Sequence, residues 1–462
     1  MMRTDRMQTT ADKELLKSYV KGMSADLIEQ YKIDPQEFKS EHIKRGLRNA
    51  DGTGVIAGVT SIGSVQGYTF VDGERMPAPG RLFYRGIDLM DIVEAHAATG
   101  TFGFEEVSYL LLLGYLPTKK HFNNYDTILS AARRMPEGFT EDVLMKSPSA
   151  NVMNKLSRAV LTLYSYDKNP DDTSAENMLR QSIELIGRMP VIVANAYALK
   201  RHYFDGDSLY LHIPKEDLSI AENFLYMLRA DKQFTPEEAR LLDLMLIMHA
   251  EHGGGNNSTF TCRVLSSTMT DTYSAIAGAI NSLKGPLHGG ANSAAMIQFA
   301  DVRAHVKDES DKDEILNYMR LIRDGKANDH SGKIYGLGHA VYTISDPRSL
   351  LLKKYAKDMA NEKGFTKDFA LMEAIEEQGL IALNEKLGNR KAICANVDMY
   401  SGLVYQMLGI PEELFTPLFA IARTAGWCAH RMEEVLTGGR IIRPGYRAVM
   451  TKQRYTPSDE RG

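Results

Sequence analysis

The sequence is poor in cysteine. Its three cysteines, Cys262, Cys394 and Cys428, are far apart, show no Cys-x-x-Cys spacing and lie among apolar or small neighbours. This pattern does not fit a disulfide framework and is typical of reduced core cysteines. We therefore expect a protein of the reducing cytosol.

Long hydrophobic runs and an excess of one charge are also missing. No apolar stretch is long enough to cross a bilayer, and the acidic residues near the N-terminus argue against a secretory signal. The formal net charge of -4 leaves no basic face for nucleic acid, although a local patch could bind an anionic cofactor. With 462 residues, we expect two domains or a large helical domain carrying a smaller one.

Apolar residues recur at helical spacing over most of the chain, which predicts a mainly α fold. Residues 1 to about 50 read as helices of a docking arm. The exception is 54–85, where short strands at 60–65 and 82–84 flank a turn at 71–74. Breaks in the helical pattern are predicted at 116–117, 189–190 and 204–206.

One helix can be delimited closely. Thr235-Pro236-Glu237-Glu238 is a capping box, and the apolar run that follows ends before three glycines, 253–255. Its last turn contains His249 and His252, which would share a helix face. A zinc site would need H-E-x-x-H or a nearby cysteine, so we expect no metal. The two histidines are either core residues or ligand-binding residues.

His288 lies in Lys284-Gly285-Pro286-Leu287-His288-Gly289-Gly290, where glycine and proline break the chain on both sides. A helix of small residues, 273–283, precedes it, and the following helix places it at an N-terminus that disfavours a charged imidazole. A neutral hydrogen-bond donor is expected, the alternative being a turn or capping residue. With His339 and Asp398, it would form a set of two donors and one base if the fold joins them.

Three arginines stand where an anion would explain them. Asp346-Pro347 predicts a helix start, which puts Arg348 against the helix dipole. Arg423 falls within an apolar stretch, where burial is costly without a carboxylate partner, and Arg443 has similar neighbours near the C-terminus.

Taken together, these stretches resemble the citrate synthase family, including 2-methylcitrate synthase. The matching stretches are His249-Ala250-Glu251-His252-Gly253-Gly254-Gly255-Asn256, Gly285-Pro286-Leu287-His288-Gly289, Gly338-His339-Ala340-Val341, Asp346-Pro347-Arg348, Asn396-Val397-Asp398 and Arg443-Pro444. They follow the family's order at similar intervals from about Gly54 to Arg443.

The resemblance implies a helical homodimer whose active site lies in a cleft between two domains. An N-terminal extension, 1–53, would precede a large domain, 54–288. A small inserted domain, 289–404, would close over substrate, and 405–462 would return to the large domain. The implied reaction joins acetyl-CoA to oxaloacetate and hydrolyses citryl-CoA, the citrate-forming step of the tricarboxylic acid cycle.

The resemblance also implies residue roles. Asp398 would be the base, His288 the donor to the thioester enol, and His339 the donor to the oxaloacetate carbonyl. The oxaloacetate ligands would be His252, Arg348, Arg423 and, from the partner subunit, Arg443. The coenzyme A contacts would be Tyr335, Gly336, Leu337, Gly338 and Asn396. No resident cofactor and no metal are implied, because the coenzyme A thioester is a substrate.

Three positions depart from the family pattern: Glu251 stands where Asp is common, Gly253 where Glu is common, and Thr343 where a basic residue often meets the coenzyme's phosphates. Two alternatives stay open. The same fold could condense propionyl-CoA, since one methylene in an apolar pocket is worth only about 1–3 kcal/mol. A non-catalytic relative could bind dicarboxylate or coenzyme A, although such a binder has no use for a base opposite two donors.

Overall fold

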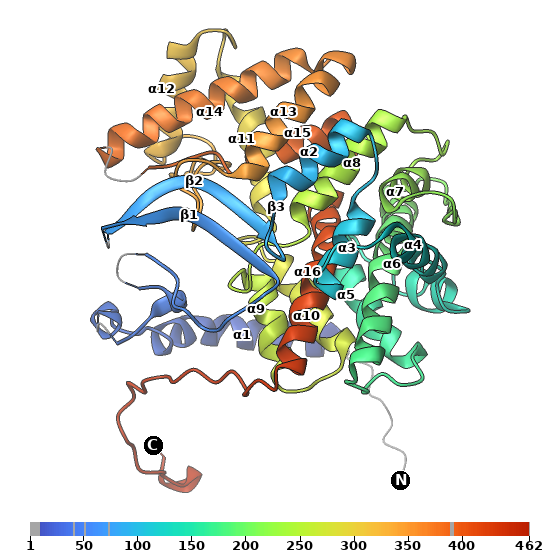
Figure 1. Ribbon diagram of the computed structural model, residues 1–462. Coiled ribbons are helices and arrows are strands. Elements are labelled where there is room, and N and C mark those ends of the chain that lie inside the picture. Colours follow the sequence, from blue (N-terminus) through green and yellow to red (C-terminus); the bar gives the residue numbers. More distant parts are fainter. Residues whose placement is uncertain (1–9, 40–41, 50–51, 73, 389–391, 462) are drawn as a thin grey trace. The chain divides into compact units, whose positions relative to one another are not determined.

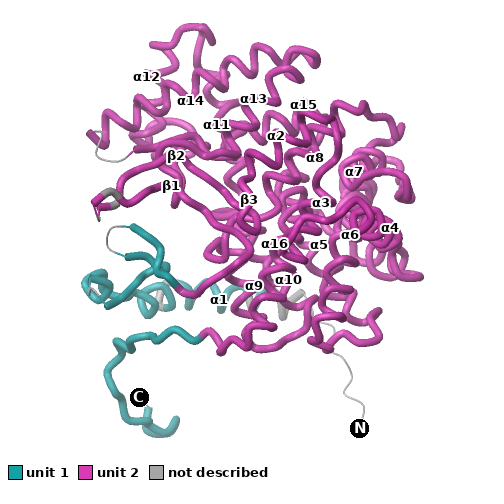
Figure 2. The backbone as a smooth tube through the Cα atoms, in the orientation of Figure 1, with its two compact units in different colours: residues 1–56, 443–462 teal, residues 57–442 magenta. Residues whose placement is uncertain are grey.

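The computed structural model describes residues 10–39, 42–49, 52–72, 74–388 and 392–461. Its contacts divide the chain into two compact units (Figure 2), one of residues 57–442 and one made of 1–56 with 443–462. The predicted boundaries of an inserted domain, 289–404, lie inside the first unit. That division stays a prediction.

The larger unit is helical almost throughout, and the mainly α class is confirmed. Its helices are α2 (Leu89–Thr99), α3 (Phe104–Leu113), α4 (Lys119–Ala132), α5 (Val152–Thr162), α6 (Ala175–Lys200), α7 (Ile220–Leu228), α8 (Pro236–His249), α9 (Asn257–Ser266), α10 (Thr272–Leu283), α11 (Ala291–His305), α12 (Lys312–Arg323), α13 (Pro347–Glu362), α14 (Thr366–Leu387), α15 (Asp398–Met407) and α16 (Phe415–Leu436). Helix α16 runs through the middle (Figure 1), where it contacts α3, α6, α8, α9 and α10. Among the described residues, no helix combines the length and hydropathy needed to cross a membrane.

The predicted β region is a hairpin with a short third strand. β1 (Gly63–Val71) pairs antiparallel with β2 (Glu74–Tyr84), and β3 (Ile87–Asp88) pairs with the end of β2. Val71 pairs with Glu74 on either side of the predicted turn, in which Gly73 lies outside the described residues, and both strands are longer than predicted. Ile62, which precedes β1, and Leu82 and Tyr84 in the last part of β2 are fully buried, so this end of the hairpin is anchored in the core.

Local sequence signals predicted several helix starts correctly. Thr235 and Glu238 form the predicted capping box of α8, and Asp346 caps α13 by accepting from the Arg348 amide. The break predicted at 189–190 is wrong, because Pro190 lies inside α6. A helix-interior proline loses one backbone hydrogen bond. Here the residues from Met189 to Leu199 are all buried, and that packing outweighs the loss.

The smaller unit contains α1 (Thr10–Gln30), two short 3₁₀ turns and an extended C-terminal segment. The helix predicted near the N-terminus is therefore confirmed for residues 10–30. Its large apolar side chains are exposed, Leu15 at 71% and Ile28 at 65%. Within this unit, Arg447 of the C-terminal segment forms an ion pair with Glu37.

Candidate active site

Arg423 is the buried cation around which the site is built. It lies on α16 with no exposed surface, and its Nε donates to the carbonyl oxygen of His249 at 2.7 Å. Its two terminal nitrogens have no hydrogen-bond partner among the described residues. Burial lowers the pKa of Arg423 to about 10, although Glu251 acts to raise it. A buried guanidinium with two unused donors is a site for an anion.

His249 and His252 lie beside this guanidinium. Because α8 ends at His249, the two rings do not share a helix face as the sequence suggested. Burial, then the charge of Arg348, holds both pKa values well below the usual range, so both rings are neutral. Nδ1 of His249 and Nε2 of His252 are buried without a partner among the described residues. His252 therefore has a hydrogen-bonding atom available beside the anion site.

Glu251 is held by contacts with His430 and with the backbone. Its Oε1 is 2.8 Å from Nε2 of His430 and accepts the Gly253 amide at 2.5 Å. Burial raises its pKa, but the His430 contact and other hydrogen bonds outweigh burial, and the net shift is downward. A Cβ at Gly63 would come within 2.8 Å of Glu251 Cγ, so β1 packs directly against the Glu251 side chain. This departure from the family pattern thus has a structural role.

His288 lies in the turn between α10 and α11. Its Nε2 is 3.0 Å from the hydroxyl of Ser258, which also contacts Asn256 Oδ1 at 2.9 Å and accepts from Trp427 Nε1 at 3.3 Å. Burial, then Arg423, lowers the pKa of His288 to about 4. This favours the neutral ring expected from the sequence, and the causes are burial and a nearby cation.

His339 has its tautomer set by the backbone. Its Nδ1 accepts hydrogen bonds from the amides of Val341 and Tyr342, both at 3.0 Å. The ring proton of neutral His339 must therefore be on Nε2. The ring stacks on Tyr342 at 4.5 Å between centroids and meets His252 edge-on at 5.2 Å. His339 is thus built as a neutral hydrogen-bond donor.

The hairpin holds the loop that follows His339. Thr343 donates its hydroxyl to the Gly67 carbonyl at 3.0 Å, and the Gly80 amide donates to Ser345 Oγ at 3.1 Å. A Cβ at either glycine would collide with the loop backbone, Gly67 with Val341 and Gly80 with Ser345. Glycine is needed at both positions because the two backbones approach so closely.

Arg348 is explained differently from the sequence prediction. Its guanidinium makes two hydrogen bonds to Asp346, Nε to Oδ1 at 3.0 Å and a terminal nitrogen to Oδ2 at 2.7 Å. The sequence predicted that a bound ligand would be the anion beside Arg348, whereas here the buried N-cap residue Asp346 supplies that charge. Sequence reasoning missed this pairing, although a carboxylate two residues away was a visible signal.

Asp398 is the first residue of α15, and its amide donates to Asn396 Oδ1 at 2.9 Å. Burial raises the pKa of its carboxyl to about 6, against the lowering effect of Arg348. The carboxylate thus lies within electrostatic reach of Arg348, which also acts on His252. Arg423 acts on both His288 and His252, and His339 also acts on His252. That His288, His339 and Asp398 form one catalytic set stays a prediction.

The expected coenzyme A segment is tied to the chain before Asp398. Asn396 donates its amide to the Gly336 carbonyl at 2.9 Å and its side chain to the Gly338 carbonyl at 2.8 Å. Leu337 forms an isolated bridge with Ala395, and Tyr335 donates its hydroxyl to Asp329 at 2.6 Å. These contacts join the segment to the base, while its role toward coenzyme A stays a prediction.

Arg443 belongs to the smaller unit, where it is exposed. Its neighbour Ile441 is 64% exposed, so the apolar setting predicted for Arg443 is wrong. The sequence also gave no notice of Ser258, Tyr342 or His430 as site residues. Of these, only His430 had a signal, a titratable side chain within an apolar helix.

Comparison with known proteins agrees with this geometry. The family model described as "Citrate synthase, C-terminal domain" matches residues 51–445. A citrate synthase from Deinococcus radiodurans is 38% identical over 376 residues, 81% of this chain and 90% of that protein. A 2-methylcitrate synthase from Shewanella oneidensis is 35% identical over 364 residues, 79% and 87% of the two chains.

A solved structure shares the fold over nearly the whole chain. It is the citrate synthase of Thermoplasma acidophilum in a ternary complex with carboxymethyl coenzyme A and oxaloacetate. The TM-score is 0.74 at 28% identity, and the match covers 91% of this chain and all of that one. With a family model matching most of its length and site residues gathered in the expected order, the chain belongs to the citrate synthase family.

Proposed function

We propose that this enzyme condenses acetyl-CoA with oxaloacetate and hydrolyses the resulting citryl thioester to citrate and coenzyme A. The observation that carries the proposal is Arg423, a buried guanidinium with two unpartnered nitrogens beside His252. A dicarboxylate suits such a site because arginine binds carboxylates in a bidentate manner. Arg348, already held by Asp346, would offer its remaining donor to the second carboxylate.

The first chemical step needs a base and a stabilised enol. Asp398 would take a proton from the acyl methyl carbon, while His288 donates a hydrogen bond to the thioester oxygen. A thioester α-proton is too weakly acidic for a carboxylate unless the developing oxyanion is stabilised in a dry site. Ser258 supports this role because its hydroxyl lies 3.0 Å from Nε2 of His288 and so helps to hold the ring in place.

The second step forms the carbon–carbon bond. The Nε2 proton of His339 would polarise the oxaloacetate carbonyl and pass to its oxygen as the enol carbon attacks. The two backbone amides on Nδ1 support this role because they hold the ring in that tautomer. Hydrolysis of the thioester then releases citrate and coenzyme A. The segment 335–338 and Asn396 would contact the coenzyme.

The proposal includes a homodimer and a cytoplasmic setting. Arg443 would serve the active site of the partner subunit, in keeping with its place on an exposed, extended segment. All three cysteines are buried thiols, which supports a reducing compartment. In that setting the reaction would feed the tricarboxylic acid cycle.

Steady-state release of coenzyme A tests the proposal. The enzyme is assayed with acetyl-CoA and with propionyl-CoA, each in the presence of oxaloacetate. We expect the higher kcat/KM with acetyl-CoA. The similarity to a 2-methylcitrate synthase makes propionyl-CoA the specific alternative, and a preference for it would shift the assignment. No release with either thioester would refute the catalytic roles.

A further inference from the structure

Arg133 is a second buried arginine with unused hydrogen-bond donors. It caps the C-terminus of α4 and is 3% exposed. One terminal nitrogen donates to the carbonyls of Lys215 and Leu218, at 3.0 and 2.6 Å. Its Nε and its other terminal nitrogen are buried and have no partner among the described residues.

Among the arginines that the structure describes, only Arg133 and Arg423 have buried nitrogens without a partner. Arg431 provides the contrast, since it is equally buried but bonds Thr272, Ser266 and Thr270 through its three nitrogens. A buried donor left unsatisfied destabilises the fold, and more so when it is charged. The feature on which the proposed substrate site at Arg423 rests, a buried guanidinium with two unpartnered nitrogens, therefore occurs a second time at Arg133.

Arg133 lines a cavity of about 550 Å³ between α4, α6 and the segment before α7. This volume lies within the usual range for small-molecule sites, about 300–1,000 Å³. Two further buried polar residues line it, Ser130 at 8% and Asn195 at 7% exposure. Three polar side chains thus line one cavity, and none belongs to the catalytic site.

The rest of the lining limits the ligand's charge and shape. Apolar side chains form part of the wall, namely Met135, Val191, Leu211, Ile213 and Pro214. Arg134 is already paired with Glu216 at 2.5 Å, and Glu141 adds another negative charge. Glu105, the acid acting most strongly on Arg133, forms no ion pair with it and accepts the Ile220 amide instead. The buried cation Arg133 thus lines the cavity, and the acids that act on it, Glu105, Asp126 and Glu222, would repel a polyanion.

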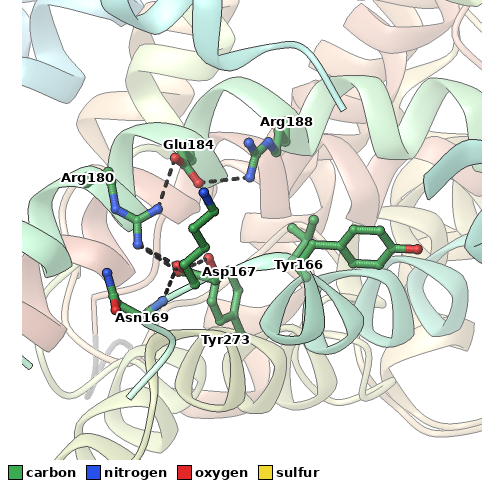
Figure 3. A pocket seen from close by; sticks show the side chains of 9 residues that line it. Tyr166, Asp167, Asn169, Arg180, Glu184, Arg188 and Tyr273 are labelled. Carbon is green, nitrogen blue, oxygen red and sulfur yellow. Dashed lines mark hydrogen bonds and ion pairs between the residues drawn. The ribbon is translucent and has the colours of Figure 1, made fainter. Parts of the chain in front are cut away.

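A neighbouring cavity shows what a fully satisfied cluster looks like. This space of about 290 Å³ is lined by Asp167, Arg180, Glu184, Arg188 and Tyr273 among others (Figure 3). Arg180 bonds both oxygens of Asp167 at 2.8 Å, and Glu184 accepts from Arg180 and Arg188 at 3.1 and 2.9 Å. These charges neutralise one another, so these arginines do not need a bound anion as a partner.

We propose that the Arg133 cavity is a second small-molecule site that binds a monocarboxylate with a short apolar body. The carboxylate is held by Nε and the unpartnered terminal nitrogen of Arg133, in the side-on bidentate geometry that guanidinium groups favour. Ser130 and Asn195 supply further hydrogen bonds. The apolar body lies against Val191 and its apolar neighbours.

Calorimetric titration of the full chain with hexanoate tests this site, with hexanamide as a neutral ligand of the same shape. Hexanoate should bind, and hexanamide and inorganic phosphate should bind at least roughly 10-fold more weakly, because each lacks either the charge or the apolar body. Arg133→Gln and Asn195→Leu should each weaken hexanoate binding by about 10-fold or more. Val191→Phe, which fills the cavity, should abolish it.

Two variants serve as controls. Arg134→Gln alters an adjacent, exposed arginine and should leave hexanoate binding unchanged, and Arg423→Leu should also leave it unchanged while impairing oxaloacetate binding. If Arg133→Gln does not fold, Val191→Phe and Asn195→Leu decide the question. The proposal is overturned if the wild-type protein does not bind hexanoate, or if inorganic phosphate binds as tightly as hexanoate. It is also overturned if hexanoate binding is lost in Arg423→Leu and kept in the Arg133, Asn195 and Val191 variants. Loss in Arg423→Leu would mean that hexanoate occupies the substrate site.

Discussion

At the scale of single residues, burial decides which groups are charged. Asp398 has a pKa raised to about 6 by burial, whereas burial and a nearby cation lower that of His288 to about 4. Between these values and neutrality, the base becomes ionised while the donor is already neutral. Burial thus raises the pKa of the base and lowers that of the donor, and the reaction needs an ionised Asp398 together with a neutral His288.

This separation predicts the pH dependence of activity. The carboxylate form of Asp398 exists above its pKa, so kcat/KM should rise with pH through about 6 and then level off. His288 titrates near 4 and should add no limb in that range. The measurement is kcat/KM for the thioester between pH 4.5 and 8. A profile without a limb near 6 would contradict the role of Asp398.

Asp398→Asn tests the base directly. We expect kcat to fall by roughly 100-fold or more with oxaloacetate binding retained, since acid–base groups contribute about 10²–10⁴. Because the folded-state pKa is raised, the proton on Asp398 stabilises the fold at low pH, and this stability is lost as pH rises through about 6. At pH 7 the variant should therefore unfold at no lower temperature than wild type. Near-normal turnover in a folded variant would remove Asp398 from the mechanism.

Arg423→Leu tests the anion site. Binding of oxaloacetate should weaken by about 1.5–3 kcal/mol for each charged hydrogen bond lost, measured by calorimetry. Arg431→Lys is the control on the same helix, because the bonds of Arg431 all lie within the protein and lysine keeps a charged donor there. Arg348 is a poorer choice, since its removal also leaves Asp346 buried and unpaired. Equal affinity in Arg423→Leu and wild type would place oxaloacetate elsewhere.

At the scale of elements, local signals in the sequence predicted helix starts better than helix ends. Capping residues such as Thr235 and Asp346 act through hydrogen bonds to the next few residues, so their effect can be read locally. The continuation of α6 through Pro190 depends on burial against distant segments, and so does the pairing that leaves Thr343 bonded to Gly67. Contacts between remote parts of the chain leave no periodic signal.

The contact between hairpin and catalytic loop yields an element-scale prediction. Gly67→Ala would drive a Cβ into the Val341 carbonyl, displacing the amides that hold His339. Overpacking of this kind costs typically about 1–3 kcal/mol. We expect a lower melting temperature together with a lower kcat, since the ring would lose its fixed tautomer. Gly58→Ala is the control, because a Cβ there meets nothing within 4 Å. Unchanged kcat in Gly67→Ala would show that the hairpin does not position His339.

At the scale of the whole molecule, the sequence located the family, while the proposed assembly rests on Arg443. Its motif lies in order with the others, and its side chain belongs to an exposed C-terminal segment of the smaller unit. An exposed arginine that matches a substrate ligand is best explained if it completes the site of a second copy. The proposed homodimer with shared active sites would give Arg443 that role.

Subunit mixing tests this arrangement. In a heterodimer of Asp398→Asn and Arg443→Leu chains, both lesions fall in one active site if Arg443 crosses between subunits, and the other site is intact. Activity should therefore return to about half that of wild type per dimer, although each parent is inactive. An obligate interface buries roughly 2,000 Å² or more, so the chains should be co-expressed with different tags and the heterodimer purified. Arg447→Leu is the control within the same segment, because Arg447 pairs with Glu37 and the variant should be active by itself. A verified Asp398→Asn and Arg443→Leu heterodimer no more active than its parents would mean that Arg443 serves its own subunit or none.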